Sequence, residues 1–340
     1  MTRPSSDLPH LAALLAPVVI VAGLLAGGPW AGLGILLVLG LYPLADLALG
    51  DAAPVRDPAR PAGALAVALP WLHGAAQIAV LAALARLAVA EGPGPGLALG
   101  AISAGLHGGC SAIVLAHELG HRRPGSAGWL LGRALLYSVH YAHFTTEHNH
   151  GHHRLVATDR DPASARAGEG LWAFVARTVP AQYRSAAAVH AARGRRWLGN
   201  PVHRGLVLQL VLLVLVALVP VHGPALAGGW LLASVVAVLL LEYVNFLQHW
   251  GLRRDPRERQ TPAHSWQSTA RWTRWTLLEL PLHPDHHLRA ARPFHELEAR
   301  DGAPTLPAGY YACFWPAMVP AVWRRWLTPR LTPSGQGGEP

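Results

Sequence analysis

Six apolar runs, separated by short Gly/Pro-rich or charged breaks, constrain the fold of this chain more than any other feature. Each run has about the 20 residues that a helix needs to cross the hydrocarbon core of a membrane. With 51% hydrophobic and only 14% charged residues, the composition also belongs to the membrane class. We therefore expect an all-α membrane protein, a single domain over residues 1–340, with six transmembrane helices at about 10–26, 31–49, 63–90, 97–116, 205–221 and 225–247.

Two polar sections, 117–204 and 248–340, are too rich in arginine to lie in lipid. The chain contains 28 arginines and no lysine, and the three short connections at 27–30, 91–96 and 222–224 have none of them. Apart from Arg86, which falls inside the third run, all arginines lie on the side of the two termini. By the positive-inside rule that side is the cytoplasm. We expect a multi-pass protein of a bacterial inner membrane, with a cytoplasmic cap formed by both polar sections. The net charge of +9 then reports membrane orientation and not a nucleic-acid partner.

Nine histidines stand in four spaced clusters, and these clusters follow the fourth and sixth runs: His117, His121, His148, His152, His153, His249, His283, His286 and His287. Residues four apart lie on one face of a helix. His117 and His121 have this spacing, as do His148 with His152 and His283 with His287, so each pair could bind one metal ion. Nine imidazoles are too many for one ion and about right for two. Because both runs end on the cytoplasmic side, all nine are expected to converge at one face of the membrane. This set predicts a two-metal site.

Some of the same residues also fit other kinds of site. His117 to His121 also matches HExxH, the zinc metalloprotease signature, but that site needs only one further protein ligand and a water. The isolated histidines, such as His190, are expected to be packing or surface residues. Cys110 and Cys313 are far apart and suggest neither a disulfide framework nor a thiolate site. Imidazole suits Zn, Cu, Fe and Ni alike, so ligand type does not name the metal.

Several polar residues next to the clusters are candidates to orient the ligand rings. Metal-bound histidines usually donate their second ring N–H to a carboxylate or carbonyl. We expect such positioning contacts from Glu118, His143, Glu147, Asp161 and Asp285. No catalytic side chain beyond the ligands and these partners is predicted.

The residues carry a resemblance to a known family. Segments 117–121, 147–153, 245–252 and 283–287 resemble the histidine motifs of the integral-membrane di-iron alkane 1-monooxygenases, relatives of xylene monooxygenases and membrane fatty-acid desaturases. Between the motifs, segments 143–144, 156–158, 161–166 and 265–268 are also similar. The likeness covers about residues 60–300. The Asp-Pro-Ala-Ser-Ala-Arg stretch at 161–166 favours the alkane branch over general desaturases.

The resemblance implies two non-haem irons held by the nine matched histidines and the use of O2 to hydroxylate an unactivated C–H bond, first of all the terminal methyl of an alkane. It implies electrons from rubredoxin or ferredoxin with an NAD(P)H-dependent reductase. Five neighbours of the ligands depart from the family pattern: Gln248, Trp250, Pro281, Leu282 and Pro284. These departures bear on the substrate and the electron donor more than on the metal site.

Two other functions stay open at this point. A desaturase, epoxidase or decarboxylase would use the same di-iron core on a fatty acyl chain. A non-catalytic metal transporter or store would distribute its histidines across the membrane depth, whereas these gather at one face.

Overall fold

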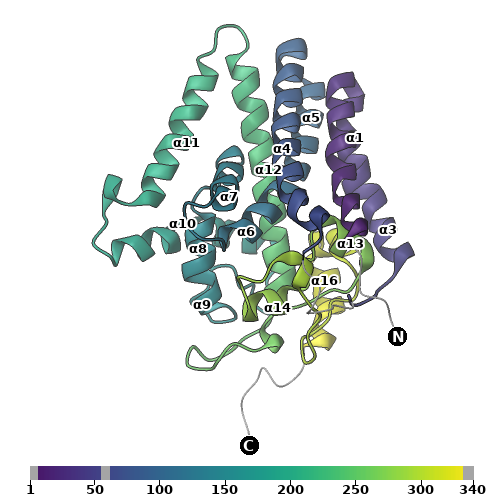
Figure 1. The fold of residues 1–340 in the computed structure, drawn as a ribbon, viewed down its shortest axis with the longest axis vertical. Helices are drawn as coiled ribbons and strands as arrows, with labels where there is room; N and C mark the ends of the chain where they lie inside the picture. The colour runs from purple at the N-terminus through teal and green to yellow at the C-terminus, as the bar shows by residue number, and fades with distance from the viewer. Residues whose placement is uncertain (1–6, 55–61, 332–340) are drawn as a thin grey trace, which may run out of the picture.

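The structure, a computed structural model, describes residues 7–54 and 62–331 (Figure 1). Arg3, Arg56 and Arg60, which the orientation argument used, lie outside the described residues. The described chain is helical, and its only extended pairings are two isolated bridges, Asp51 with Ala270 and Gln267 with Thr305. The expected all-α class is confirmed. Figure 1 shows long, roughly parallel helices above a cap of short helices and loops.

Five of the expected spans are helical segments long and apolar enough to cross a membrane: Leu8–Ala26, Gly28–Leu49, Ala64–Glu91, Pro95–Gly120 and Gly223–His249. The fifth expected span corresponds to α11, a shorter apolar helix over Pro201–Ala217, so the count of six stays a prediction. Within these segments the α-helical parts are α1 Leu15–Ala26, α2 Leu33–Ile35, α3 Tyr42–Leu49, α4 Ala64–Glu91, α5 Pro95–His107, α6 Val114–Gly120 and α12 Gly223–His249.

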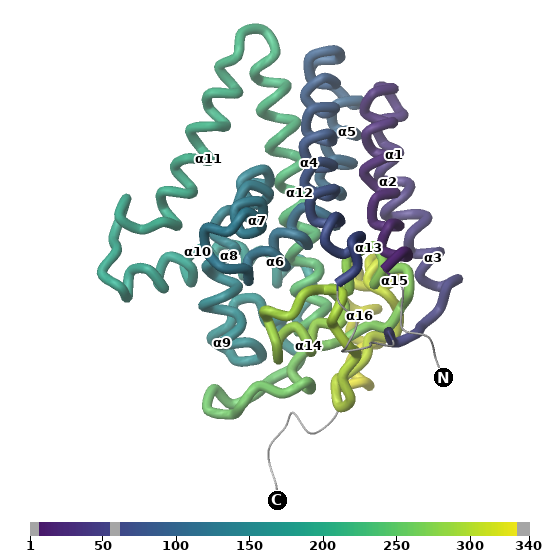
Figure 2. Tube along the Cα trace, viewed as in Figure 1, coloured from purple at the N-terminus to yellow at the C-terminus, as the bar shows by residue number. Residues whose placement is uncertain are grey.

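The cap consists of short elements between and after these helices. Its α-helices are α7 Ala127–Ser138, α8 Phe144–Glu147, α9 His153–Leu155, α10 Leu171–Ala191, α13 Arg271–Thr276, α14 His283–Leu288, α15 Tyr310–Met318 and α16 Pro320–Leu327. In Figure 2, α9, α14 and α16 lie below α6, so segments from both halves of the chain meet there.

Small residues let the two central helices approach closely. A Cβ added to Gly105 would lie 2.5 Å from the Ala233 carbonyl oxygen, and one added to Gly109 would lie 2.6 Å from the Cβ of Leu240. Glycine at such contacts is the usual way in which membrane helices pack at short range. This packing holds the ends of the fourth and last long spans side by side, and those ends carry His117 and His249.

Buried carboxylates attach the cap to the first two spans. Asp46 accepts hydrogen bonds from the backbone N–H and hydroxyl of Thr273, at 2.9 and 2.7 Å, and from the N–H of Tyr311 at 3.0 Å. Glu279 pairs with Arg274 at 2.6 Å and with the ring of His10 at 3.0 Å. A buried charge is tolerated only when it is paired and hydrogen-bonded, so these contacts fix the cap at one height against the bundle.

Candidate metal centre

The nine clustered histidines come together at the junction of α6, the segment 148–155, the end of α12 and α14. Eight of them form two groups in which the four candidate ligand nitrogens all lie within 4.8 Å of one another. The first group is His117, His121, His148 and His286; the second is His152, His249, His283 and His287.

A π-helical turn over His148–His152 decides which histidine joins which group. In this turn the N–H of His153 bonds to the carbonyl of His148, five residues back. The extra residue brings the ring of His153 next to His148, with 2.9 Å between their Nε2 atoms. His152 is rotated to the other group, 3.2 Å from Nε2 of His287. Single π-turns are rare and are frequent at functional sites.

His153, the ninth histidine, therefore lies beside the first group. Its Nε2 is also 3.1 Å from Nε2 of His286. In the other group, Nε2 of His283 lies 3.2 Å from that of His249 and 2.9 Å from that of His287. The α-helical spacing of four residues in α14 produces this last contact, as the sequence predicts.

The ring nitrogens have the separations and the protonation state that a shared ion requires. Two nitrogens bound to one ion at about 2.1 Å are roughly 3.0–3.4 Å apart, close to the separations within each group. Burial, and then repulsion by neighbouring rings, holds the pKa values of His148, His153 and His286 well below the ordinary value. Burial also lowers the pKa of His121 to about 4. Neutral imidazoles are the form that binds metals, so the donor set fits a pair of imidazole-bound ions.

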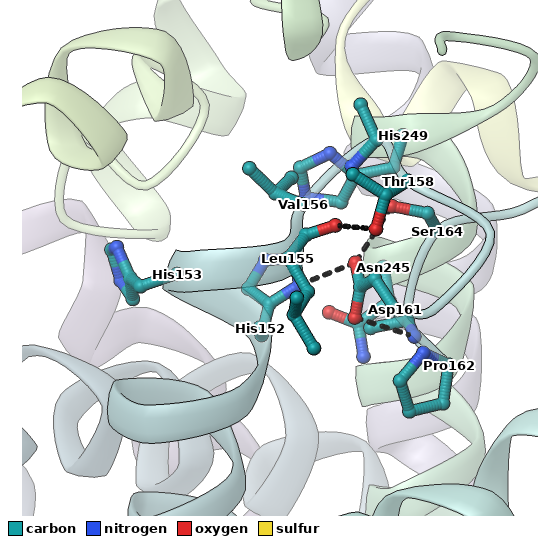
Figure 3. A network of polar contacts seen from close by, with 12 residues as sticks. His152, His153, Leu155, Val156, Thr158, Asp161, Pro162, Ser164, Asn245 and His249 are labelled. Atoms are coloured by element: carbon teal, nitrogen blue, oxygen red, sulfur yellow. Dashed lines mark hydrogen bonds and ion pairs between the residues drawn. The ribbon is translucent and has the colours of Figure 1, made fainter. Parts of the chain in front are cut away.

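Asp161 contacts the ring of a candidate ligand, His152. Its Oδ2 lies 2.9 Å from Nδ1 of His152 and accepts the Ser164 hydroxyl at 2.6 Å, while Oδ1 accepts the N–H of Ala163 at 3.1 Å (Figure 3). Burial alone would raise the pKa of Asp161, but the electrostatic interaction with the His152 ring and the hydrogen bonds from His152 and Ser164 hold that pKa below its ordinary value. Because a carboxylate can only accept, Nδ1 of His152 carries the proton, and Nε2 is the ligand atom.

The other predicted positioning residues contact different partners. Glu118 pairs with Arg122 at 3.3 Å and accepts the N–H of Phe294 at 3.4 Å. Asp285 is fully buried and bonds to Arg292 and Arg300 instead of a ligand ring. That contact anchors the loop after α14, which lies over the site.

Glu147 and His143 also contact groups other than the rings of the candidate ligands. Glu147 is buried beside Ser185 and the Asp161 and Glu242 carboxylates, and its pKa is raised well above the ordinary value, chiefly by burial. His143 packs against Tyr141 and Tyr183, 4.3 and 5.5 Å between ring centroids, and lines a separate groove.

Sequence reasoning missed a fully buried carboxylate, Glu242, two turns before His249 on α12. It accepts hydrogen bonds from Tyr141 at 3.0 Å, from Gln182 at 2.9 and 2.8 Å, and from Asn245 at 3.1 Å. Asn245 lies next to Asp161 in Figure 3. An acidic residue inside an apolar span is costly and usually functional, and that rule applied to Glu242 would have found it.

The residues that depart from the family pattern have structural roles at the site. Gln248 donates to the Tyr310 hydroxyl at 3.1 Å, and Trp250 donates from its ring nitrogen to the Glu169 carbonyl at 3.0 Å. Pro284 lies in the first turn of α14, where its missing N–H costs no helical hydrogen bond. Each change leaves the ligand nitrogens free.

Two small apolar cavities lead toward the first histidine group. One lies between α12, α15 and two π-helical segments, and its walls include Val38 and Cys110. The other has His117 and His286 in its wall. Val114 belongs to both walls, so the two cavities adjoin on either side of one side chain.

Comparison with known proteins is consistent with this geometry. Residues 93–324 match the fatty acid desaturase family. The chain is 34% identical over 242 residues to an alkane 1-monooxygenase of Pseudomonas putida, covering 68% of this chain and 59% of that protein. It is 31% identical over 334 residues to alkane 1-monooxygenase 2 of Alcanivorax borkumensis, covering 89% and 83% of the two chains. It is also 28% identical over 224 residues to the hydroxylase component of a xylene/toluene monooxygenase of Pseudomonas putida, covering 63% and 59%.

The matched region thus spans somewhat more than half the length of the Pseudomonas putida enzymes and most of the Alcanivorax protein. The segment that matches the family, residues 93–324, contains all four histidine clusters. The chain belongs to the fatty acid desaturase family of membrane proteins, in the branch of the alkane 1-monooxygenases.

Proposed function

We propose that this protein is a membrane monooxygenase that hydroxylates the terminal methyl group of an alkane or a similar apolar chain. The observation that carries the proposal is the pair of adjacent imidazole groups, the first of which borders a small, mostly apolar cavity through His117 and His286. Relatives named alkane 1-monooxygenases support the reaction class.

Two iron ions are the proposed cofactors. His117, His121, His148, His153 and His286 would hold one, and His152, His249, His283 and His287 the other. When bound, iron supplies the activation of O2, from which one oxygen atom enters the C–H bond and the other leaves as water, with two electrons and two protons supplied from outside. The chain fixes the ring nitrogens, and Asp161 fixes the tautomer of His152.

The apolar cavities provide a route for the substrate. Their walls bear Val, Leu and aromatic side chains, with a polar neighbour only where the histidines begin. The first of them is narrow, so a chain enters end-on by displacing flexible side chains. A terminal methyl group is then the first carbon to reach the site, and positioning selects it over weaker internal C–H bonds.

Electrons must reach the site from a partner, and we propose rubredoxin or ferredoxin with its NAD(P)H-dependent reductase, acting at the cytoplasmic face of the inner membrane. His121 and His153 are partly exposed, whereas the second group is fully buried, so the first group is nearer to a docked donor. Exposed arginines such as Arg123 and Arg154 surround this face. A small acidic redox protein would be steered toward such a surface.

The test is a reaction under labelled oxygen gas. Membranes that contain the full-length protein are supplied with a medium-chain alkane, reduced rubredoxin and ¹⁸O2. The products are separated by gas chromatography, and their ¹⁸O content is measured by mass spectrometry. The proposal expects the terminal alcohol carrying one labelled atom. Alcohol without label, or an alkene formed from a fatty acyl substrate in place of alcohol, contradicts it; the second result supports acyl desaturation, the function in the name of the matched family.

A further inference from the structure

A large groove on the opposite side of the site from the small cavities has no role in the proposed reaction. It has a volume of about 780 Å³ and lies between α10, α11, α12 and the loop after α7. Along α12 it extends from Leu231 to Leu239, a rise of about 12 Å at 1.5 Å per residue. Its walls are mostly apolar, with Leu206 and Val235 as examples.

A buried wall separates this groove from the histidines. Tyr141 lines the groove, and its hydroxyl donates to Glu242 at 3.0 Å. Gln182, on α10, also donates a hydrogen bond to the Glu242 carboxylate. A chain in this groove therefore lies behind the site and does not reach the ligand nitrogens. The groove is a different compartment from the proposed substrate route.

Several polar atoms inside the groove have no hydrogen-bond partner in the described part of the chain. The side-chain Nε2 of Gln209, a residue only 4% exposed, is buried without a hydrogen-bond acceptor. Nε2 of His140 and of His143 are buried and unpartnered in the same wall. Leaving a buried polar atom without a hydrogen-bond partner is unfavourable, so these atoms point to a ligand that carries hydrogen-bonding oxygens. A plain hydrocarbon has none.

The cap end of the groove carries an exposed cation. Arg184 lines the groove, and no salt-bridge partner for it is found among residues 7–54 and 62–331. The outer side of α11 bears exposed apolar residues such as Leu210 and Val211, so the groove continues into the lipid-facing surface. Basic pockets between membrane helices at this height bind the headgroups of anionic lipids.

We propose that the groove binds one anionic phospholipid from the leaflet on the cap side. One acyl chain packs along α12 against Leu231 and Val235. The ester oxygens lie against Gln209 and His143, and the phosphate pairs with Arg184. Such a lipid packs against Tyr141 and so supports the wall behind His152. This site is additional to the substrate and metal sites.

The test uses full-length protein, stripped of lipid in a mild detergent and titrated with dioleoyl-phosphatidylglycerol or dioleoyl-phosphatidylcholine under native mass spectrometry. Val235→Trp fills the groove. Val211→Trp is its matched control, because both valines are 47% exposed and only the first lines the groove. Arg184→Gln removes the cation, and Arg204→Gln, another exposed arginine nearby, is the charge control. Thermal melting verifies that each variant is folded.

The proposal expects one retained phosphatidylglycerol per chain, preferred about fivefold over phosphatidylcholine, as one arginine near a headgroup provides. Val235→Trp loses this lipid and Arg184→Gln loses the preference, while both controls keep both properties. Equal lipid retention in the two tryptophan variants overturns the proposal. So does a second copy of the chain occupying the groove, seen as an oligomer that Val235→Trp dissociates, and so does displacement of the lipid by the alkane or its alcohol.

Discussion

Replacing Asp161 by asparagine should weaken metal binding at the second histidine group while leaving the fold intact. The carboxylate is 2% exposed and accepts three hydrogen bonds, from His152, Ser164 and the backbone of Ala163. An amide of the same shape has one acceptor oxygen. If its nitrogen faces His152, Nδ1 must accept, and the proton moves to the ligand atom Nε2. If the amide nitrogen faces Ala163 instead, it meets the Ala163 N–H, and two donors oppose each other. In both cases the negative charge of the carboxylate is lost.

The size of the effect follows from the role of the contact. Loss of a buried partner that orients a ligand ring typically costs 10–100-fold in metal affinity. That corresponds to about 1.4–2.8 kcal/mol, near the value of a hydrogen bond to a charged group. Ser164→Ala removes only a neutral donor to the same carboxylate and should cost about 1 kcal/mol, or roughly fivefold.

The assay is chelator competition on the iron-loaded protein, with iron per chain measured at each chelator concentration. Wild-type protein should release its metal in two steps, and Asp161→Asn should move one step to 10–100-fold lower chelator. Asp159→Asn is the control, because that side chain is 87% exposed and two residues away. Release of both ions from Asp161→Asn at the wild-type concentration would refute the role assigned to Asp161.

Three further predictions concern orientation, substrate and stability. Reporter fusions at residues 94 and 223 should read periplasmic and fusions at 190 and the C-terminus cytoplasmic; a periplasmic signal at 190 reverses the orientation. Val38→Phe, in the wall of the narrow cavity, should shift product formation toward shorter alkanes, whereas Val80→Phe, equally buried outside that wall, should not; an unchanged chain-length profile places the substrate elsewhere. Burial raises the pKa of Glu279, but His10 and Arg274 outweigh it and hold that pKa at about 2, below the ordinary 4.5. The contacts of the Glu279 carboxylate with His10 and Arg274 therefore contribute about 3 kcal/mol to the free energy of unfolding above pH 4.5, and this contribution is lost as the pH falls from 4.5 toward 2. A melting temperature that Glu279→Gln leaves unchanged at pH 7 contradicts this.

The membrane class and the ligand set follow from local patterns in the sequence. Run length predicts spanning helices, and five of the six runs form segments of sufficient length. Two of these helices end on the same side of the membrane, and histidines with i, i+4 spacing follow both ends. Such histidines are therefore expected to converge at that face of the membrane. The contact of His283 with His287 across one turn of α14 is the spacing that this argument uses.

The division of the ligands between two groups could not be predicted in the same way. His148 and His152 have the spacing of an α-helical pair, yet they lie in different groups because the turn between them is π-helical. The stability of that turn depends on the surrounding packing, which no local pattern reports. The same limit applies to Asp285: proximity in sequence suggests a ligand partner, but Arg292 and Arg300 return from the following loop to bind it.

Buried polar residues far apart in the sequence were the hardest to assign. Glu242, Tyr141 and Gln182 come from three separate elements and meet in one hydrogen-bond network. Only the identity of Glu242, an acid inside an apolar run, signals its importance. Its partners are ordinary residues whose roles emerge from tertiary contact alone.

The central claim is that nine histidines hold two ions, and metal analysis of the purified full-length protein tests it most directly. Protein produced with iron should contain close to two iron atoms per chain. His152→Ala and His286→Ala, one from each group, should each lose about one iron and most activity, while His190→Ala, outside both groups, should retain two. A single iron per chain in the wild-type protein that both His152→Ala and His286→Ala retain would contradict the account. So would one zinc ion or more per chain in fully active protein.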